Sequence, residues 1–265
     1  MRVQAFEFMD LPQTPRYLRD SIVESLGNSL RWSGVYKNAV AEFSEFCASL
    51  QSNTLLDLGS GSGEPVAILL DTLNNQGEKL PYFLLSDLFP VIHKMERVIE
   101  KFPNNVKAIK IPLDASSVPD GIPHSARVVI STFHHFAPDL AKGILQDSAE
   151  KGKPIFILEA MTRSLNSVFK LGIFFLLSIM INPFWSKQDR LLKAIFTYPI
   201  PLIPLMGIWD GVVSVRRMYT EKELMALTST IDANFQWKFH KIPVPWGGTI
   251  SVFVGKPHEA ATGCE

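Results

Sequence analysis

The stretch Thr54-Leu-Leu-Asp-Leu-Gly-Ser-Gly-Ser-Gly-Glu64 decides how the chain is organised. It opens as a short apolar run, and glycines follow at positions 59, 61 and 63. Such a run ending in glycines is typical of a buried parallel strand that enters a tight turn. From Glu64 to Leu73 the apolar residues recur at helical spacing. The stretch therefore predicts a strand, a glycine loop and a helix.

The same alternation continues on both sides of this stretch. Apolar runs predict further strands at 82–86, 106–111, 126–131, 154–158, 235–242 and 249–255. Helical spacing and a capping-box sequence predict helices at 18–30, 35–50, 91–101, 138–149 and 220–229. Strands that alternate with helices form a parallel sheet that is covered on both faces. We therefore expect an α/β fold with a doubly wound, mostly parallel sheet and two N-terminal helices.

The spacing and charge of the glycine loop indicate the kind of ligand it holds. A dinucleotide site uses Gly-x-Gly-x-x-Gly to bind a pyrophosphate, whereas this loop is Gly-x-Gly-x-Gly between Asp57 and Glu64. Acidic groups around the loop suit a cationic, zwitterionic ligand better than a pyrophosphate. A nicotinamide-dependent oxidoreductase is the less favoured alternative, because its acidic residue follows the loop by about 20 residues and Asp87 lies 26 after Gly61.

An acidic residue followed by Gly-x-Gly-x-Gly after the first strand resembles the first motif of the class I S-adenosylmethionine-dependent methyltransferases. The resemblance implies a seven-stranded, Rossmann-like sheet with the last strand antiparallel, and S-adenosyl-L-methionine as cofactor. It also implies the residues around the methionine portion of the donor: Asp57, Gly59, Ser60, Gly61, Gly63 and Glu64. Asp87, with Leu88 beside it, would accept the ribose hydroxyls, and Asp114, with Ala115, would meet the adenine. The alternative is that Asp87 and Asp114 only cap the turns that follow them.

The segment Ser131-Thr-Phe-His-His-Phe136 stands where members of this family line the substrate side of the donor. Thr132 is expected to touch the donor there. His134 or His135 is a candidate general base, because a histidine near its ordinary pKa can take a proton from a hydroxyl. The alternatives are that the histidines only pack and hydrogen-bond, or that Glu159 is the base rather than a partner of Arg163.

The N-terminal helices and a late apolar insertion surround this predicted core. We expect one methyltransferase domain over 1–265, with a helical cap at 1–53 and an apolar lid at 165–219. Tyr17 in the cap is a candidate contact to the donor. Residues 168–213 are much more apolar than the rest, and three explanations stand: a site for an apolar substrate, a peripheral membrane contact, or a homodimer surface.

Composition limits the remaining function classes. Lys plus Arg and Asp plus Glu are 26 each, so no overall charge favours nucleic acid. Two distant cysteines, Cys47 and Cys264, suggest neither a disulfide framework nor a metal site. The N-terminus lacks a signal-peptide pattern, so we expect a cytoplasmic protein. The sequence predicts methyl transfer, most readily to oxygen, on an apolar small molecule such as a lipid, prenylated ring or polyketide. The alternative is an inactive methyltransferase-like module that associates with a membrane or partner.

Overall fold

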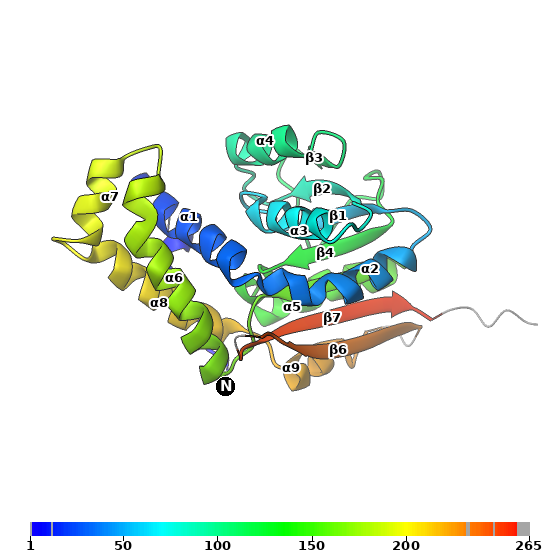
Figure 1. Cartoon of the computed structure of the whole chain (residues 1–265). Coiled ribbons are helices and arrows are strands. Elements are labelled where there is room, and N and C mark those ends of the chain that lie inside the picture. The colour runs from blue at the N-terminus through cyan, green and yellow to red at the C-terminus, as the bar shows by residue number, and fades with distance from the viewer. Residues whose placement is uncertain (1, 12, 232–233, 246, 259–265) are drawn as a thin grey trace, which may run out of the picture. The chain divides into compact units, whose positions relative to one another are not determined.

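The structure, a computed structural model, describes residues 2–11, 13–231, 234–245 and 247–258 (Figure 1). The chain divides into two compact units. The first, here called the sheet unit, comprises 39–159, 220–242 and 251–265. The second, here called the helical unit, comprises 1–38, 160–219 and 243–250. The single-domain expectation and the limits drawn for the cap and the lid stay predictions.

The structure contains a seven-stranded sheet, and this confirms the predicted fold. The strand order is β3-β2-β1-β4-β5-β7-β6. Strands β1 to β5 pair in parallel, and β7 runs antiparallel to β5. The strands are β1 Thr54–Leu58, β2 Tyr82–Ser86, β3 Val106–Ala108, β4 Ala126–Ile130, β5 Ile155–Glu159, β6 Phe235–Pro243 and β7 Thr249–Pro257. Every residue of β4 and β5 is buried, as expected of central strands covered on both faces.

Five α-helices accompany the sheet in the described part of its unit. They are α2 Val40–Ala48, α3 Glu64–Asn75, α4 Ile92–Lys101, α5 Pro138–Glu150 and α9 Glu221–Thr228. The apolar side of α3 is fully buried, which confirms the helix that follows the glycine loop. At the start of α9 the Thr220 hydroxyl accepts the backbone N–H of Glu223, and the Glu223 carboxylate accepts that of Thr220. The predicted capping box is therefore present.

Two predicted elements differ from the structure. The strand expected over 106–111 ends at Ala108, because its neighbour β2 ends at Ser86 and offers no further partner beyond the Leu85 carbonyl, which accepts the Ile109 N–H. Ile111 beyond it is 70% exposed. The helix expected over 35–50 is two elements, a 3₁₀ turn η2 (Val35–Ala39) followed by α2. Cys47 in α2 is buried, which raises its pKa to about 12, while Cys264 lies outside the described residues.

The helical unit contains α1 Arg16–Ser33, α6 Leu165–Trp185, α7 Arg190–Thr197 and α8 Leu202–Arg217 (Figure 1). These include the predicted helical insertion. Its apolar core is small and consists of Leu18, Ile22, Ile179, Ile203 and Met206. Helix α6 packs against both α1 and α8. At the crossing with α8, a Cβ on Gly207 would lie 2.6 Å from Ile179 Cδ1, so the absence of a side chain permits the approach.

Among the described residues, no single helix has both the length and the apolar content needed to cross a bilayer. Helices α7 and α8 meet that criterion of length and composition only as a pair, with a 74° bend between them.

Candidate cofactor and active site

The glycine loop after β1 adopts a backbone that only glycine accommodates easily. Gly59, Gly61 and Gly63 all have positive φ, at 72°, 54° and 75°. A Cβ on Gly63 would lie 2.9 Å from Leu85 Cδ1, and one on Gly59 would lie 3.1 Å from Thr132 Cγ2. The loop is therefore tightly fitted at its two ends. Nothing lies within 4 Å of a Cβ built on Gly61, so the middle of the loop is open.

Hydrogen bonds fix this loop to the end of β2. The Ser60 N–H donates to the Ser86 carbonyl (2.9 Å), and the Ser86 N–H donates to Ser60 Oγ (3.0 Å). Both serine hydroxyls donate to the carbonyl of Asp57, at 3.1 Å and 2.7 Å. Sequence reasoning predicted Ser60 but missed Ser86. The available signal was a polar residue that ends an otherwise apolar strand directly before Asp87.

Asp57 is buried within this arrangement, with 2% of its surface exposed. Burial raises its pKa to about 8, the negative charge of Asp87 adds to the rise, and Ser60 opposes it. A positive charge nearby would offset the free-energy cost of ionising a carboxyl group in this environment. The expectation that the loop holds a positively charged ligand stays a prediction.

Asp87 connects the glycine loop to the second strand. Its Oδ2 accepts the Gly61 N–H at 2.7 Å, and its Oδ1 accepts the Phe89 N–H at 2.8 Å. The bond to Phe89 caps the turn after β2, and such capping was the alternative role considered for Asp87. Because a carboxylate has about four acceptor positions, room remains for two hydroxyl donors. Leu88, beside it, is 48% exposed.

Asp114 follows β3 and is exposed. Its Oδ1 accepts both the N–H and the hydroxyl of Ser116, at 2.8 Å and 2.7 Å, so it caps its own turn. The chain just before it is tied to Asp87, whose carbonyl accepts the Leu113 N–H at 2.9 Å. Ala115 is half-buried. The structure thus brings the second and third predicted acidic positions to adjoining turns, and their contact with a donor stays a prediction.

Two further predicted donor contacts border the loop. Thr132 is half-buried, and the glycine at position 59 leaves space for its methyl group. It follows Ser131, whose φ of 52° is a strained left-handed conformation for a residue with a side chain. Glu64 is the first residue of α3, and its N–H donates to the Ser62 hydroxyl at 3.3 Å.

His134 and Glu159 form a buried pair on the 3₁₀ turn η3 (Phe133–His135) and the end of β5. The Nδ1 of His134 lies 3.0 Å and 3.1 Å from the two carboxylate oxygens, and the His134 backbone N–H also donates to the carboxylate at 2.9 Å. The ring of His135 lies beside that of His134, with centroids 4.3 Å apart. Arg163, the proposed partner of Glu159, donates to the carbonyl of Met218. Glu159 therefore orients a histidine.

Tyr17 belongs to the helical unit rather than to the sheet unit. Its ring stacks on Phe196 of α7 with centroids 5.5 Å apart. Its predicted contact with the donor stays a prediction.

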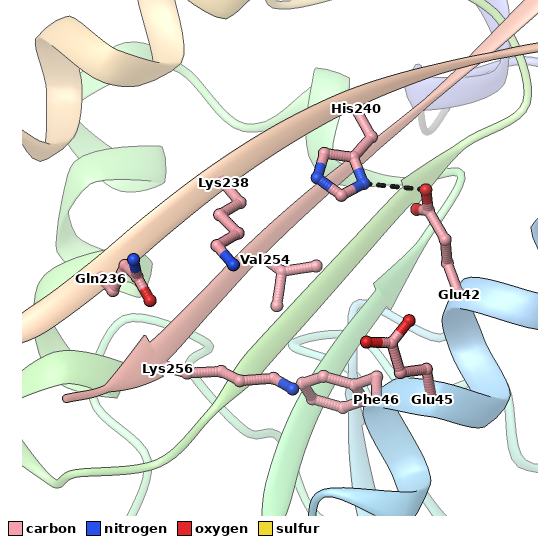
Figure 2. Close-up of a pocket in the computed structure, with 8 residues that line it drawn as sticks. All are labelled: Glu42, Glu45, Phe46, Gln236, Lys238, His240, Val254 and Lys256. Atoms are coloured by element: carbon pink, nitrogen blue, oxygen red, sulfur yellow. Dashed lines mark hydrogen bonds and ion pairs between the residues drawn. The ribbon is translucent and has the colours of Figure 1, made fainter. Parts of the chain in front are cut away.

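A cavity of about 120 Å³ lies among α2, β6 and β7, and Figure 2 shows its lining. His240 points toward Glu42, with Nδ1 and Oε1 2.8 Å apart, and Lys256 Nζ lies 5.2 Å from the centre of the Phe46 ring. Its lining includes none of the residues predicted to bind the donor or to act as base.

Comparisons with solved structures bear on the fold. The plantazolicin methyltransferase BpumL, in complex with SAH, has a TM-score of 0.53 and 10% sequence identity, over 95% of this chain and 93% of that one. TnmH has a TM-score of 0.50 and 16% identity, over 92% of this chain and 59% of that one. No protein-family model and no curated protein sequence matches the chain. Together with the strand order and the glycine loop, these likenesses show that the chain has the fold of the class I S-adenosylmethionine-dependent methyltransferases.

Proposed function

We propose that the protein transfers a methyl group from S-adenosyl-L-methionine to an oxygen of an apolar small molecule. The observation that carries this proposal is the placement of Asp57 and Asp87 at one glycine loop, with Asp114 on an adjoining turn. Asp57 is buried and has a raised pKa, Asp87 holds the loop N–H of Gly61, and the turn before Asp114 is bonded to Asp87.

These residues fit the donor by their chemistry. The glycine loop and Asp57 would hold the cationic methionine portion, Asp87 would accept the ribose hydroxyls, and Asp114 would face the adenine. When bound, the donor supplies a methyl group on a sulfonium, which is already activated and leaves as a neutral thioether. The protein therefore has mainly to position the two reactants, and positioning alone supplies a large part of such an acceleration.

The His134 and Glu159 pair gives the site a proton acceptor. A carboxylate against Nδ1 favours the tautomer that carries its proton on Nδ1 and a lone pair on Nε2. In that tautomer Nε2 can take the proton of an acceptor hydroxyl as its oxygen bonds to the methyl carbon. Glu159 then stabilises the imidazolium that results. This arrangement supports transfer to oxygen over transfer to carbon.

The apolar acceptor is supported by the composition of residues 165–219. Phe, Leu, Ile, Met and Trp dominate this segment, and ligand pockets for small molecules are predominantly apolar. A lipid, a prenylated ring or a polyketide that carries a hydroxyl would suit it.

Calorimetric titration with S-adenosylhomocysteine tests the donor site. We expect micromolar binding by the natural protein and a loss of at least about tenfold in the Asp87→Ala variant, because each hydrogen bond from a neutral group to a charged one contributes roughly 1.5–3 kcal/mol. Asp120→Ala is the matched control, since the side chain of Asp120 is 89% exposed. Absence of binding by the natural protein would contradict the proposal.

Transfer of a labelled methyl group to a panel of apolar hydroxyl compounds tests the chemistry. The His134→Gln variant should bind S-adenosylhomocysteine normally and lose about 10²–10⁴-fold in rate, the usual contribution of a positioned base. Unchanged rates in this variant would remove His134 from the mechanism and leave the donor site intact.

A further inference from the structure

Helix α6 exposes an apolar stripe along its length. The stripe consists of Phe169, Ile173, Leu176, Leu177, Met180 and Phe184, which are 38–68% exposed. Their spacing of three and four residues places them on one side of the helix. A helix of a water-soluble protein normally turns this side toward the core.

The side of α6 that faces the protein is mixed. It buries Leu171 and Ile179 together with Ser178 and Asn182, which are 0% and 4% exposed. Asn182 accepts the hydroxyl of Ser21 on α1 at 3.3 Å and donates to Glu24 at 3.0 Å. Within the described ranges, the hydroxyls of Ser178 and of Ser25 on α1 are buried without a hydrogen-bond partner. Helix α6 therefore buries polar groups while its longest apolar stripe stays exposed.

Helix α8 has the same distribution of buried polar groups and an exposed apolar stripe. Leu205, Ile208, Trp209 and Val212 are 41–61% exposed and follow the same helical spacing. The buried side holds Asp210, which accepts the N–H groups of Phe8 and Met9 at 2.7 Å and 3.2 Å. Two contacting helices thus bury polar groups beside a small apolar core and expose continuous apolar stripes, which is the arrangement expected of a protein surface that meets hydrocarbon.

We propose that the helical unit docks on the surface of an anionic lipid bilayer through these two apolar stripes. The net charge of the helical unit favours an anionic bilayer as the binding partner. The helical unit carries twelve Lys and Arg against six Asp and Glu, a net charge of +6, whereas the sheet unit carries fourteen against twenty, a net charge of −6. Juxtamembrane cations are attracted to anionic headgroups by about 1 kcal/mol each. A second copy that docked through the same stripes would bring like charge to the interface, which favours an anionic bilayer over self-association.

The turn between α6 and α7 shows the residue types that lie at a headgroup boundary. Trp185 is 61% exposed and Leu191 is 74% exposed. Lys187 and Arg190 lie between them and are also exposed. Tryptophan prefers the boundary between hydrocarbon and water, and long cationic side chains reach from it to the headgroups. Because the other side of α6 packs on α1, the helix would lie in the bilayer surface with one side in contact with lipid.

Flotation with phospholipid vesicles tests the docking. We expect the full chain to float with vesicles of phosphatidylcholine mixed with phosphatidylglycerol, and to bind pure phosphatidylcholine much more weakly. The double variant Leu177→Gln, Leu205→Gln should lose at least about tenfold in vesicle affinity, because it removes apolar contact without changing charge. The control is Leu140→Gln, which changes an apolar residue of the sheet unit that is 39% exposed. The pair Lys187→Gln, Arg190→Gln should reduce binding to the anionic vesicles alone.

Two results would overturn the proposal. One is no flotation by the natural chain when circular dichroism shows it folded. The other is a dimer, seen by light scattering, that the double variant abolishes while vesicle binding is absent, since that would assign the stripes to a second copy. The measurement needs neither donor nor acceptor, so failure of the proposed methyl transfer would leave its result unaffected.

Discussion

The sheet unit and the helical unit distribute polarity in opposite ways. In the sheet unit, the apolar strands are buried and the charged side chains gather at strand ends, around the glycine loop. In the helical unit, serines, an asparagine and the Arg217–Glu7 ion pair are buried beside a small apolar core, and two long apolar stripes are outside. The difference teaches that apolar content in a sequence does not by itself separate a core from an exposed apolar surface. Under the two proposals above, the sheet unit would hold the donor and the helical unit would meet the apolar environment.

The sharpest test of this contrast is the same substitution in each unit. Leu69 in α3 is fully buried, so Leu69→Ala should cost about 2–5 kcal/mol of unfolding free energy through lost contacts and a cavity. Leu177 is 51% exposed, so Leu177→Ala should change it by less than about 0.5 kcal/mol. Calorimetric melting of both variants measures the difference. Equal losses would show that the α6 stripe is part of a core.

Burial of Asp57 predicts a pH dependence of stability. Its folded pKa of about 8 lies above the ordinary aspartate value of 3.8, so between these values the folded state holds a proton that the unfolded state has lost. Stability from this group therefore falls as pH rises from about 4 to about 8 and is constant above that. Asp57→Asn should raise the melting temperature by several degrees at pH 8.5 and by less at pH 5. A gap that stays constant with pH, as expected for the exposed control Asp120→Asn, would contradict the assignment.

The loop glycines offer a smaller contrast within the sheet unit. Gly63→Ala should cost about 2 kcal/mol or more, because the positive φ is unfavourable and the new methyl would meet Leu85. Gly61→Ala has the same backbone penalty but open space, so about 1 kcal/mol is expected. Urea unfolding curves of the two variants give the values. If Gly61→Ala lowered the unfolding free energy more than Gly63→Ala, the inference that the loop is tightly fitted at Gly63 would be wrong.

The smallest effect concerns the buried ion pair of the helical unit. Lys193 is 1% exposed and its Nζ lies 2.8 Å from Glu24 Oε2. Lys193→Met should change stability little, because an apolar side chain of similar size replaces a buried cation. Glu24→Ala should cost about 1 kcal/mol more, since it leaves the ammonium buried without its carboxylate. The reverse order in thermal melting would indicate that the pair stabilises the unit.

Most of the sheet could be predicted from the sequence because its rules are local. Alternating apolar runs and helices, with glycines at 59, 61 and 63, determine the strand, the loop and the following helix. The exceptions are instructive. The third strand is short because its neighbour β2 ends at Ser86. The exposure of the α6 stripe gives no signal in composition, since a stripe of Phe and Leu predicts a buried side equally well.

The candidate site was predictable where a residue's place along the chain determines its place in the sheet. Asp57 and Asp87 come at the ends of adjacent strands, so their approach followed from the order of the elements. The partner of His134 did not follow in this way. Glu159 is 25 residues further on, and its position beside His134 depends on the 3₁₀ turn that follows β4, which the residue types do not indicate.

The exposed stripes have a practical consequence for handling the protein. In buffer without lipid or detergent, the exposed apolar side chains of α6 and α8 can leave water only by contacting those of another molecule. Particle size in such buffer would then depend on protein concentration and on added amphiphile. Preparations kept in a mild detergent should yield particles of uniform size. Adding vesicles to preparations made without detergent should restore a uniform size.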